Sequence, residues 1–145
     1  MKMSYRITTD STCDLPQAFY EERGIAYIGL SFQLDGKEYK EGTDNSLSSK
    51  EFYNQLRAGK QSSTMQVNTY DFVAFLEPIL AAGDDVLHIA FSSGLSGTCN
   101  LVRVVGAQTD GMEVAVFDTQ SGSLGIGMTV LQAARWIEQG WSWNN

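Results

Sequence analysis

The sequence predicts an α/β domain built on a mainly parallel sheet with helices on both faces. Strand-like runs alternate along the chain with segments of helical periodicity, and this alternation is typical of parallel sheets joined by right-handed crossovers. Residues 85–91 form a largely apolar run between turn signals, as strands covered on both faces do. The length of 145 residues fits about one domain.

The first three elements are predicted from turn and capping residues. Residues 5–9 predict a short strand, and 16–23 predict a helix that stops at Gly24, because glycine tolerates the backbone of a helix end. Asp14 stands just before this helix and is expected to accept hydrogen bonds from its first amides. The apolar residues 25–32 predict one strand.

The next elements include one strong hairpin signal. The Asp-Gly pair at 35–36 predicts a tight turn before a short return strand at 37–40. A capping-box pattern, serine and glutamate three places apart, predicts a helix over 48–57. The polar segment 61–69 predicts irregular structure.

The second half of the chain has clearer periodicity. Residues 70–80 carry apolar side chains at helical spacing, although Pro78 predicts a kink or an early end, since proline removes a backbone hydrogen bond. The remaining predicted elements are a strand at 85–91, a turn at 92–98, a helix to about 107, a strand at 112–117 and a helix at 124–139.

Charge and composition exclude several classes of function. The formal net charge is −7 at pH 7, opposite to the basic face that nucleic-acid binding needs, and it disfavours docking on an anionic membrane by charge alone. No opening segment resembles a signal peptide, and no apolar run approaches the ~20 residues of a membrane span. Cys13 and Cys99 are expected as reduced thiols, so a cytoplasmic, soluble protein is expected.

His88 is the single histidine and lies inside the apolar run at 85–91. Because the chain has no Cys/His cluster, a metal site is not expected, and no cofactor is expected either. The histidine is interpreted as a strand side chain with one hydrogen bond.

Three polar turns follow strands of the predicted sheet: TDSTCD at 9–14, SSGLSGT at 92–98 and DTQSGS at 118–123. Ligands of parallel α/β sheets bind at the carboxyl ends of the strands, where these turns lie. The segment 61–69 adds further hydroxyl groups. Neutral hydroxyls and helix N-termini together are suited to hold an oxyanion. The alternative is that each serine or threonine only caps a helix.

Nucleophilic catalysis and nucleotide binding are disfavoured. Ser96 lies in GLSG at 94–97, one residue short of the hydrolase elbow G-x-S-x-G. A serine nucleophile needs a base, and His88 is expected to be buried. The sequence GIG at 125–127 does not continue as GxGxxG, and no G-x-x-x-x-G-K-[ST] loop occurs.

Four segments together resemble the DegV family: TDSTCDLP at 9–16, TMQVN at 64–68, SSGLSGT at 92–98 and DTQSGSLGIG at 118–127. Their order and spacing match the family over essentially the whole chain, and the first and third motifs are specific as a pair. Members are bacterial fatty-acid-binding proteins, and some serve as the acyl-carrying subunit of a fatty-acid kinase. The resemblance implies two α/β domains with one fatty acid buried between and within them.

Residues 1–145 then correspond to the first, N-terminal domain, and a C-terminal domain absent from this chain is an expected partner. The last residues agree with this interpretation. Trp141 and Trp143 follow a helix, and Ser142 is a plausible cap for another. The pattern predicts an interrupted chain.

The resemblance implies that the hydroxyls of Thr64 and Ser93 bind the fatty-acid carboxylate. The expected ligand site consists of Ser63, Thr64, Gln66, Ser92, Ser93, Gly94 and Ser96. In the family's turn a serine, a proline and a serine usually stand where this sequence has Met65, Val67 and Asn68. The rigidity of the turn is therefore expected to differ. Basic residues near the head group are implied for the second domain.

An acyl tail needs an apolar channel, because each CH₂ group moved out of water contributes about 0.8 kcal/mol. Apolar residues expected to line such a channel, or else to belong to the core, are Ile28, Phe32, Phe91 and Leu95.

The leading hypothesis is a carrier that sequesters a long-chain fatty acid and presents its carboxylate to a kinase, without chemistry of its own. Two alternatives remain open: a phosphotransfer-type enzyme domain, which needs an exposed His88, and a regulatory interaction module. The expected partners are the fatty acid, a fatty-acid kinase, the C-terminal domain and, transiently, a membrane, but no nucleic acid.

Overall fold

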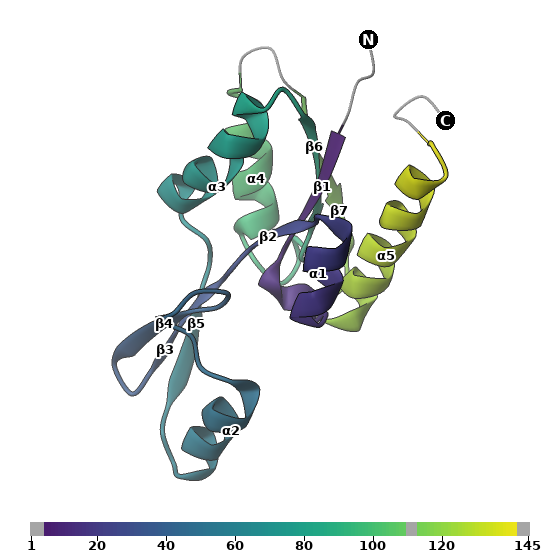
Figure 1. Cartoon of the computed structure of the whole chain (residues 1–145). Coiled ribbons are helices and arrows are strands. Elements are labelled where there is room, and N and C mark those ends of the chain that lie inside the picture. Colours follow the sequence, from purple (N-terminus) through teal and green to yellow (C-terminus); the bar gives the residue numbers. More distant parts are fainter. Residues whose placement is uncertain (1–4, 110–112, 142–145) are drawn as a thin grey trace.

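The computed structural model describes residues 5–109 and 113–141. A parallel sheet of four strands lies at its centre, in the order β2-β1-β6-β7 (Figure 1). These strands are β1 (Tyr5–Asp10), β2 (Ala26–Ile28), β6 (Asp85–Ala90) and β7 (Val114–Asp118). The predicted α/β fold with a parallel sheet is confirmed.

Helices cover both faces of this sheet (Figure 1). On one face lie α1 (Gln17–Arg23) and α5 (Leu124–Glu138), and on the other lie α3 (Thr69–Ala81) and α4 (Thr98–Gly106). Each face has its own apolar cluster. Side chains of α1 and α5 pack with Ile7 and Ile89 of the sheet, whereas side chains of α3 and α4 pack around Val86.

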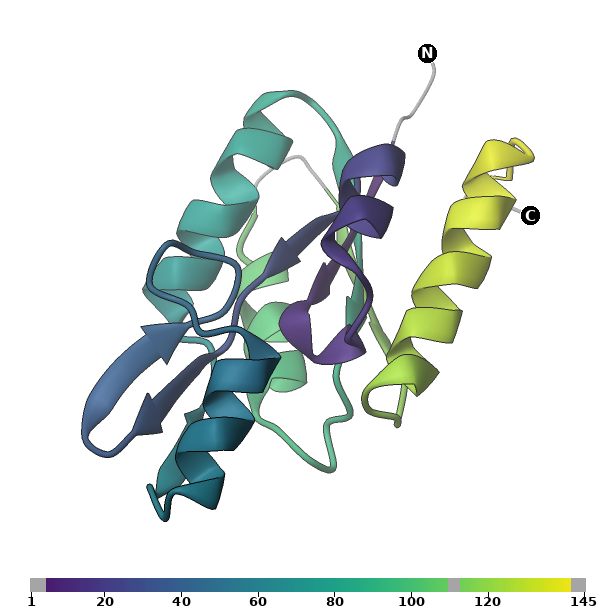
Figure 2. The ribbon, with the colours of Figure 1, turned by 60° about the horizontal axis from the view of Figure 1, so that its bottom comes forward.

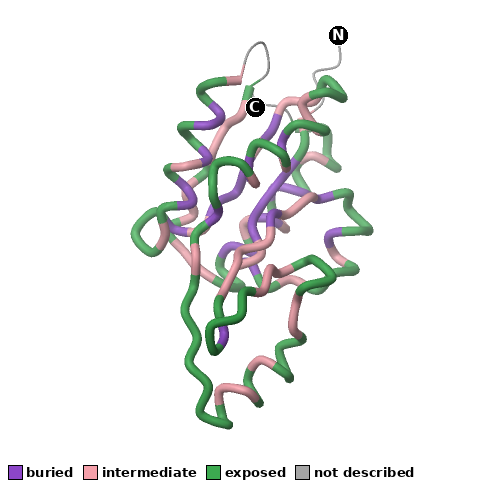
Figure 3. The backbone as a smooth tube through the Cα atoms, turned by 90° about the vertical axis from the view of Figure 1, so that its left-hand side faces the viewer, coloured by how far each residue is buried: buried purple, intermediate pink, exposed green. Residues whose placement is uncertain are grey.

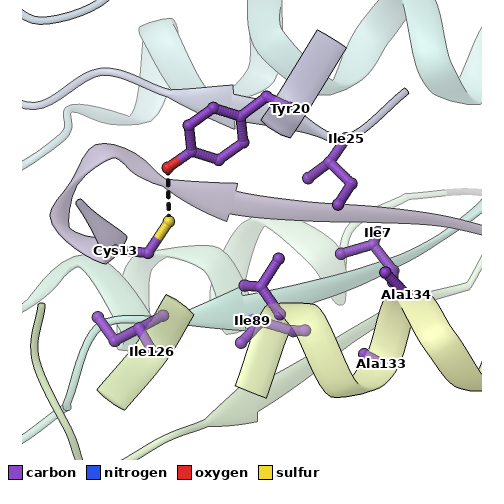
Figure 4. Packing of buried hydrophobic residues seen from close by; sticks show 9 residues of the cluster. Ile7, Cys13, Tyr20, Ile25, Ile89, Ile126, Ala133 and Ala134 are labelled. Atoms are coloured by element: carbon purple, nitrogen blue, oxygen red, sulfur yellow. Dashed lines mark hydrogen bonds between the residues drawn. The ribbon is translucent and has the colours of Figure 1, made fainter. Parts of the chain in front are cut away.

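The cluster under α1 and α5 includes a buried thiol (Figure 4). The Sγ atom of Cys13, from the short 3₁₀ helix η1 (Ser11–Cys13), lies 2.7 Å from the Tyr20 hydroxyl oxygen. Burial raises the pKa of the Cys13 thiol. Both Cys13 and Cys99 are buried and free, in agreement with the predicted thiols.

A second, antiparallel sheet projects from the first (Figures 1 and 2). Its order is β4-β3-β5, with β3 (Ser31–Leu34), β4 (Lys37–Lys40) and β5 (Ser62–Met65). Helix α2 (Ser49–Arg57) lies beside it, and we call residues 31–65 the small lobe. Buried residues concentrate around the parallel sheet, and residues of the small lobe are mostly exposed or intermediate (Figure 3). The lobe is tied to α3 by an ion pair between Lys40 Nζ and Asp71 Oδ2, 2.6 Å apart.

The prediction of one strand over 25–32 was wrong, because the chain leaves the parallel sheet at Gly29 and enters the small lobe. Gly29 lets the backbone of Glu41 approach closely: a Cβ atom here would lie 1.8 Å from the Glu41 carbonyl oxygen. The Glu41 N–H in turn donates to the Leu30 carbonyl at 3.0 Å. This contact separates β2 from β3.

The irregular structure predicted for 61–69 holds for residues 66–68 but was wrong for 62–65, which form β5. This strand pairs with β3, with Thr64 opposite Phe32. Its serines and threonine are exposed, so the strand carries no apolar pattern that periodicity detects.

Two local predictions around helix ends need correction. The helix predicted over 70–80 does not end early: α3 continues through Pro78 to Ala81, because this proline stands in the last turn and its carbonyl still accepts from Ala82. Asp14 does not cap α1, whose cap residue is Pro16. Asp14 instead has a left-handed backbone, φ 52°, after η1.

Other local predictions hold. Ser48 and Glu51 form the predicted capping box, and the 35–36 turn has the positive φ angles of a hairpin turn. Met112 of the predicted strand at 112–117 and the proposed cap Ser142 lie outside the described residues. Within 5–109 and 113–141, no helix has the length and apolar character that a membrane crossing requires.

His88 lies in the middle of the parallel sheet and is fully buried. Its Nδ1 atom is 2.9 Å from the Thr8 hydroxyl oxygen, and its ring meets Phe72 edge to face. Nε2 finds no partner among the described residues. Burial lowers the pKa of His88 to about 4, and the negative charge of Asp10 opposes this shift. The single hydrogen bond confirms its interpretation as a strand side chain.

The buried histidine predicts a loss of stability in mild acid. Its pKa in the folded chain, about 4, lies below the ordinary value of ~6.5, so the unfolded chain binds more protons between these values. We expect the free energy of unfolding to fall by about 3 kcal/mol as the pH drops from 7 to 4 through this group. Urea unfolding of wild type and His88→Asn across this range measures it. An equal pH dependence in both proteins would contradict the assignment.

Candidate ligand-binding site

The three polar turns meet at the carboxyl edge of the parallel sheet, as predicted. The N–H of Ser92 donates to the Ser121 carbonyl at 3.1 Å, which joins the second turn to the third. The Ser123 hydroxyl donates to Asp14 Oδ2 at 2.6 Å, which joins the third turn to the first. The Thr119 hydroxyl, at 2.8 Å, also donates to the Ala90 carbonyl at the end of β6.

Asp10 holds the first two turns together, a role that was not predicted from the sequence. This carboxylate is fully buried at the end of β1. Its Oδ1 accepts from the N–H and the hydroxyl of Thr12, and its Oδ2 accepts from the N–H of Phe91 at 2.9 Å. An aspartate followed by serine and threonine at the end of a buried strand was the available signal, since such residues bond the backbone two places on.

A cavity of about 380 Å³ lies between these turns and the small lobe. Its apolar lining is Leu30, Phe32, Leu47, Phe52, Tyr53 and Phe91. Its polar lining is Ser11, Thr12, Asp14, Ser31, Glu41, Ser49, Thr64 and Ser123. The turns of the parallel sheet and the small lobe therefore both contribute to one cavity, which apolar side chains and hydroxyl groups line.

Of the seven predicted ligand residues, Thr64 alone belongs to this lining. Ser63 is next to it on β5, where neighbouring side chains point to opposite faces. Gln66 packs against the second turn: a Cβ atom on Gly97 would lie 2.2 Å from Gln66 Oε1. The turns of Thr64 and Ser93 are thus in contact through Gln66 and Gly97.

The remaining four residues lie in the 92–98 turn and mostly bond within it. Ser92 is buried, and its hydroxyl accepts from the N–H of Gly94 at 3.2 Å. The Ser96 hydroxyl accepts from the N–H of Thr98 and donates to the Thr98 hydroxyl. Ser93 is exposed and donates its hydroxyl proton to Asp118.

Two of the four apolar residues predicted for a channel, Phe32 and Phe91, line the cavity. Ile28 does not, because it packs in the apolar cluster under α3 and α4. Leu95 is 68% exposed and lies outside the cavity lining.

Comparison with known proteins identifies the family of this chain. Residues 4–145 match the model of the family described as "Uncharacterised protein, DegV family". The chain belongs to the DegV family. A DegV domain-containing protein of Clostridium perfringens is 37% identical over 138 residues, covering 92% of this chain and 47% of the relative.

Solved DegV structures share the fold at similar identity. A fatty-acid-binding DegV family protein from Thermus thermophilus is 33% identical with a TM-score of 0.88, over 98% of this chain and 50% of that protein. DegV from Bacillus subtilis, described as a fatty acid binding protein, is 30% identical with a TM-score of 0.86, over 96% of this chain and 49% of that one. The chain therefore spans about half the length of these DegV relatives.

The cavity of this DegV domain is acidic on one side. Glu41 and Asp14 line it, and its lining includes no lysine or arginine from the described part of the chain. Burial raises the pKa of Glu41, while the hydroxyl of Ser11, which donates to its Oε2, lowers it. The available donors toward an anion are hydroxyl groups.

Removal of one hydrogen-bonding oxygen of Asp10 is expected to destabilise the site and the fold together. In Asp10→Asn an amide group replaces one acceptor opposite Thr12 or Phe91, and a buried donor loses its partner. We expect the free energy of unfolding to fall by about 3 kcal/mol in chemical denaturation.

The matched control is Asp14→Asn, whose one described donor, the Ser123 hydroxyl, keeps an acceptor, and whose left-handed backbone suits asparagine. This change is expected to cost under about 0.5 kcal/mol. Equal effects of the two substitutions would show that Asp10 does not have the special role inferred from its three bonds.

Proposed function

We propose that this domain binds a long-chain fatty acid, with its carboxylate held by the hydroxyls of Thr64 and Ser93 and its tail in the apolar part of the cavity. The observation that carries the proposal is one cavity in which the Thr64 hydroxyl lies with aromatic side chains from the small lobe and from the edge of the parallel sheet. Its volume of about 380 Å³ lies in the range of small-molecule sites.

The apolar wall of the cavity is well packed. The ring of Phe32 meets Phe52 edge to face at 5.1 Å and stacks on Tyr39 at 5.4 Å. An acyl tail placed against these rings leaves water, at about 0.8 kcal/mol for each CH₂ group. For a tail of ~16 carbons this contribution exceeds that of the head group.

The polar side of the cavity favours a particular orientation of the acid. An ionised carboxylate is repelled by Glu41 and Asp14, which supports the proposed position at Thr64. No hydrogen bond of the Thr64 hydroxyl is found within the part of the chain that the structure describes. Its proton is therefore available to an anion, and bonds from hydroxyls to a carboxylate are charge-assisted.

The relatives support the same ligand class. The Thermus thermophilus and Bacillus subtilis structures are of fatty-acid-binding DegV proteins, and a Thermotoga maritima neighbour, 29% identical with a TM-score of 0.84, is described as revealing fatty acid binding function. The role proposed for this domain is to carry the acid, in the cytoplasm, without transforming it.

A second half, about as long again, is proposed to complete the protein. β7 is the edge of the described parallel sheet, and beside it lies an apolar groove of about 620 Å³. Phe117, Met128 and Trp136 in this groove are 53%, 72% and 45% exposed. Although α5 lies on this face of the sheet, it leaves these apolar side chains exposed, and exposed apolar surface of this kind marks an interaction site. We assign the groove to the polypeptide of the second half.

The phosphotransfer alternative loses its main requirement. It needed an exposed histidine, and His88 is fully buried with a ring held by Thr8 and Phe72. No observation on the described residues favours a regulatory module over a carrier.

Bound lipid tests the function directly. Denaturation of the purified full-length protein is expected to release a long-chain fatty acid, which mass spectrometry detects. Residues 1–145 alone are expected to retain little fatty acid, because half of the enclosing surface is missing. Thr64→Val keeps the shape and removes the hydroxyl, so we expect about tenfold weaker binding of hexadecanoate.

Ser63→Ala is the matched control, because it removes a hydroxyl on the same strand outside the cavity lining. It is expected to leave the affinity unchanged. A full-length protein that neither releases nor binds a fatty acid would refute the function.

Amide exchange tests whether the second half covers the groove beside β7. Slow exchange in β7 of the longer protein and fast exchange in the fragment would support this assignment, and equal rates would refute it.

A kinase partner is the finer part of the proposal. Incubation of the loaded full-length protein with ATP and a fatty-acid kinase is expected to phosphorylate the bound acid, whereas the protein with ATP alone is expected to yield no acyl phosphate. Product formation without the kinase would contradict the role of a carrier.

A further inference from the structure

The hydroxyl of Ser93 is already engaged in this structure. Its Oγ atom donates to Asp118 Oδ2 at 2.5 Å, and the N–H of the same residue donates to Oδ1 at 3.2 Å. A serine hydroxyl has one proton to donate, and an ionised carboxylate has none. In this arrangement Ser93 has no proton for a ligand carboxylate, in contrast to Thr64.

Asp118 is held firmly in its place at the end of β7. Its Oδ1 also accepts from the N–H of Gln120 at 3.1 Å, and its side chain is 14% exposed. The hydrogen bond from the Ser93 hydroxyl is the main cause that lowers the pKa of this carboxyl. Asp118 is therefore ionised near neutral pH, next to a serine proposed to bind an anion. Arg103, 4.0 Å away, is its described cationic neighbour.

The backbone around Ser93 is fixed, so its hydroxyl is the part that can reorient. Phe91 is tied to Asp10, and Ser92 is tied to Ser121. Rotation of one hydroxyl about its side-chain bond needs no movement of these neighbours.

We propose that Asp118 competes with the ligand carboxylate for the hydroxyl proton of Ser93 and thereby limits the affinity for an ionised acid. This inference rests on the proposed function, which assigns the carboxylate to Thr64 and Ser93. Binding exchanges one charge-assisted hydrogen bond of Ser93 for another, so this contact adds little net affinity. Thr64 provides the donor whose bond is not exchanged.

Asp118 accepts hydrogen bonds both from the backbone of its turns and from the Ser93 hydroxyl, and Asp118→Asn separates these two roles. The asparagine Oδ1 still accepts from the N–H groups of Ser93 and Gln120, which keeps the turn in place. Its Nδ2 donates to the Ser93 hydroxyl oxygen, which frees the serine proton for the ligand. The substitution also removes a negative charge beside Ser93.

The test measures binding of hexadecanoate and of its uncharged methyl ester to the full-length protein. We expect Asp118→Asn to lower the Kd for hexadecanoate about tenfold and to leave that for the methyl ester nearly unchanged. The gain is expected to disappear in the Ser93→Ala background. The control Asp35→Asn removes one charge at the tip of the β3–β4 hairpin, outside the cavity lining, and is expected to have no effect.

The outcomes distinguish this inference from the function on which it rests. If wild type binds hexadecanoate and Asp118→Asn binds it equally or more weakly, the competition is refuted and the carrier function stands. If neither protein binds it, both fall. Carbon-13 NMR titration of the Asp118 carboxyl gives a check that needs no ligand. Ser93→Ala is expected to raise its pKa, and an unchanged pKa refutes the competition.

Discussion

The arrangement of the candidate site depends on the buried carboxylate of Asp10. A charge taken out of water destabilises the fold unless hydrogen bonds satisfy it, and its two oxygens take all their described bonds from Thr12 and Phe91. The first turn and the end of β6 therefore cannot separate without leaving a buried charge unpaired. The 92–98 turn directly follows Phe91, so its position depends on the same interaction.

The charged residues that line the cavity are acidic, which is unusual for an anion site. It is proposed to hold a carboxylate although Glu41 and Asp14 line it and the chain as a whole is acidic. Attraction by net charge therefore cannot provide the affinity, which must come from hydroxyl protons close to the ligand and from burial of an apolar tail. Such a site selects for the tail and uses the head group mainly for orientation.

Much of the fold was predictable because its signals are local. Turn residues, the capping box and apolar periodicity located β1, β6 and most helices. The end of β2 was not predictable, since the need for Gly29 arises from Glu41, 12 positions away in sequence and brought close only by folding. β5 was missed for a related reason: its polar residues become a strand through pairing with β3.

For the site, the motifs located the right edge of the sheet but not the state of each hydroxyl. Thr64 lies at the cavity, whereas Ser93 is bonded to Asp118, 25 positions away. Hydrogen-bond partners of this kind depend on side-chain directions in the folded chain, which spacing along a sequence does not provide.

The low burial of the small lobe bears on the speed of ligand exchange. Within the small lobe, all of whose residues are described, Leu34 alone is buried. Regions with so little buried surface open locally at the lowest free energy. The wall formed by the lobe is then the proposed entrance for the ligand, and its local opening would set the residence time.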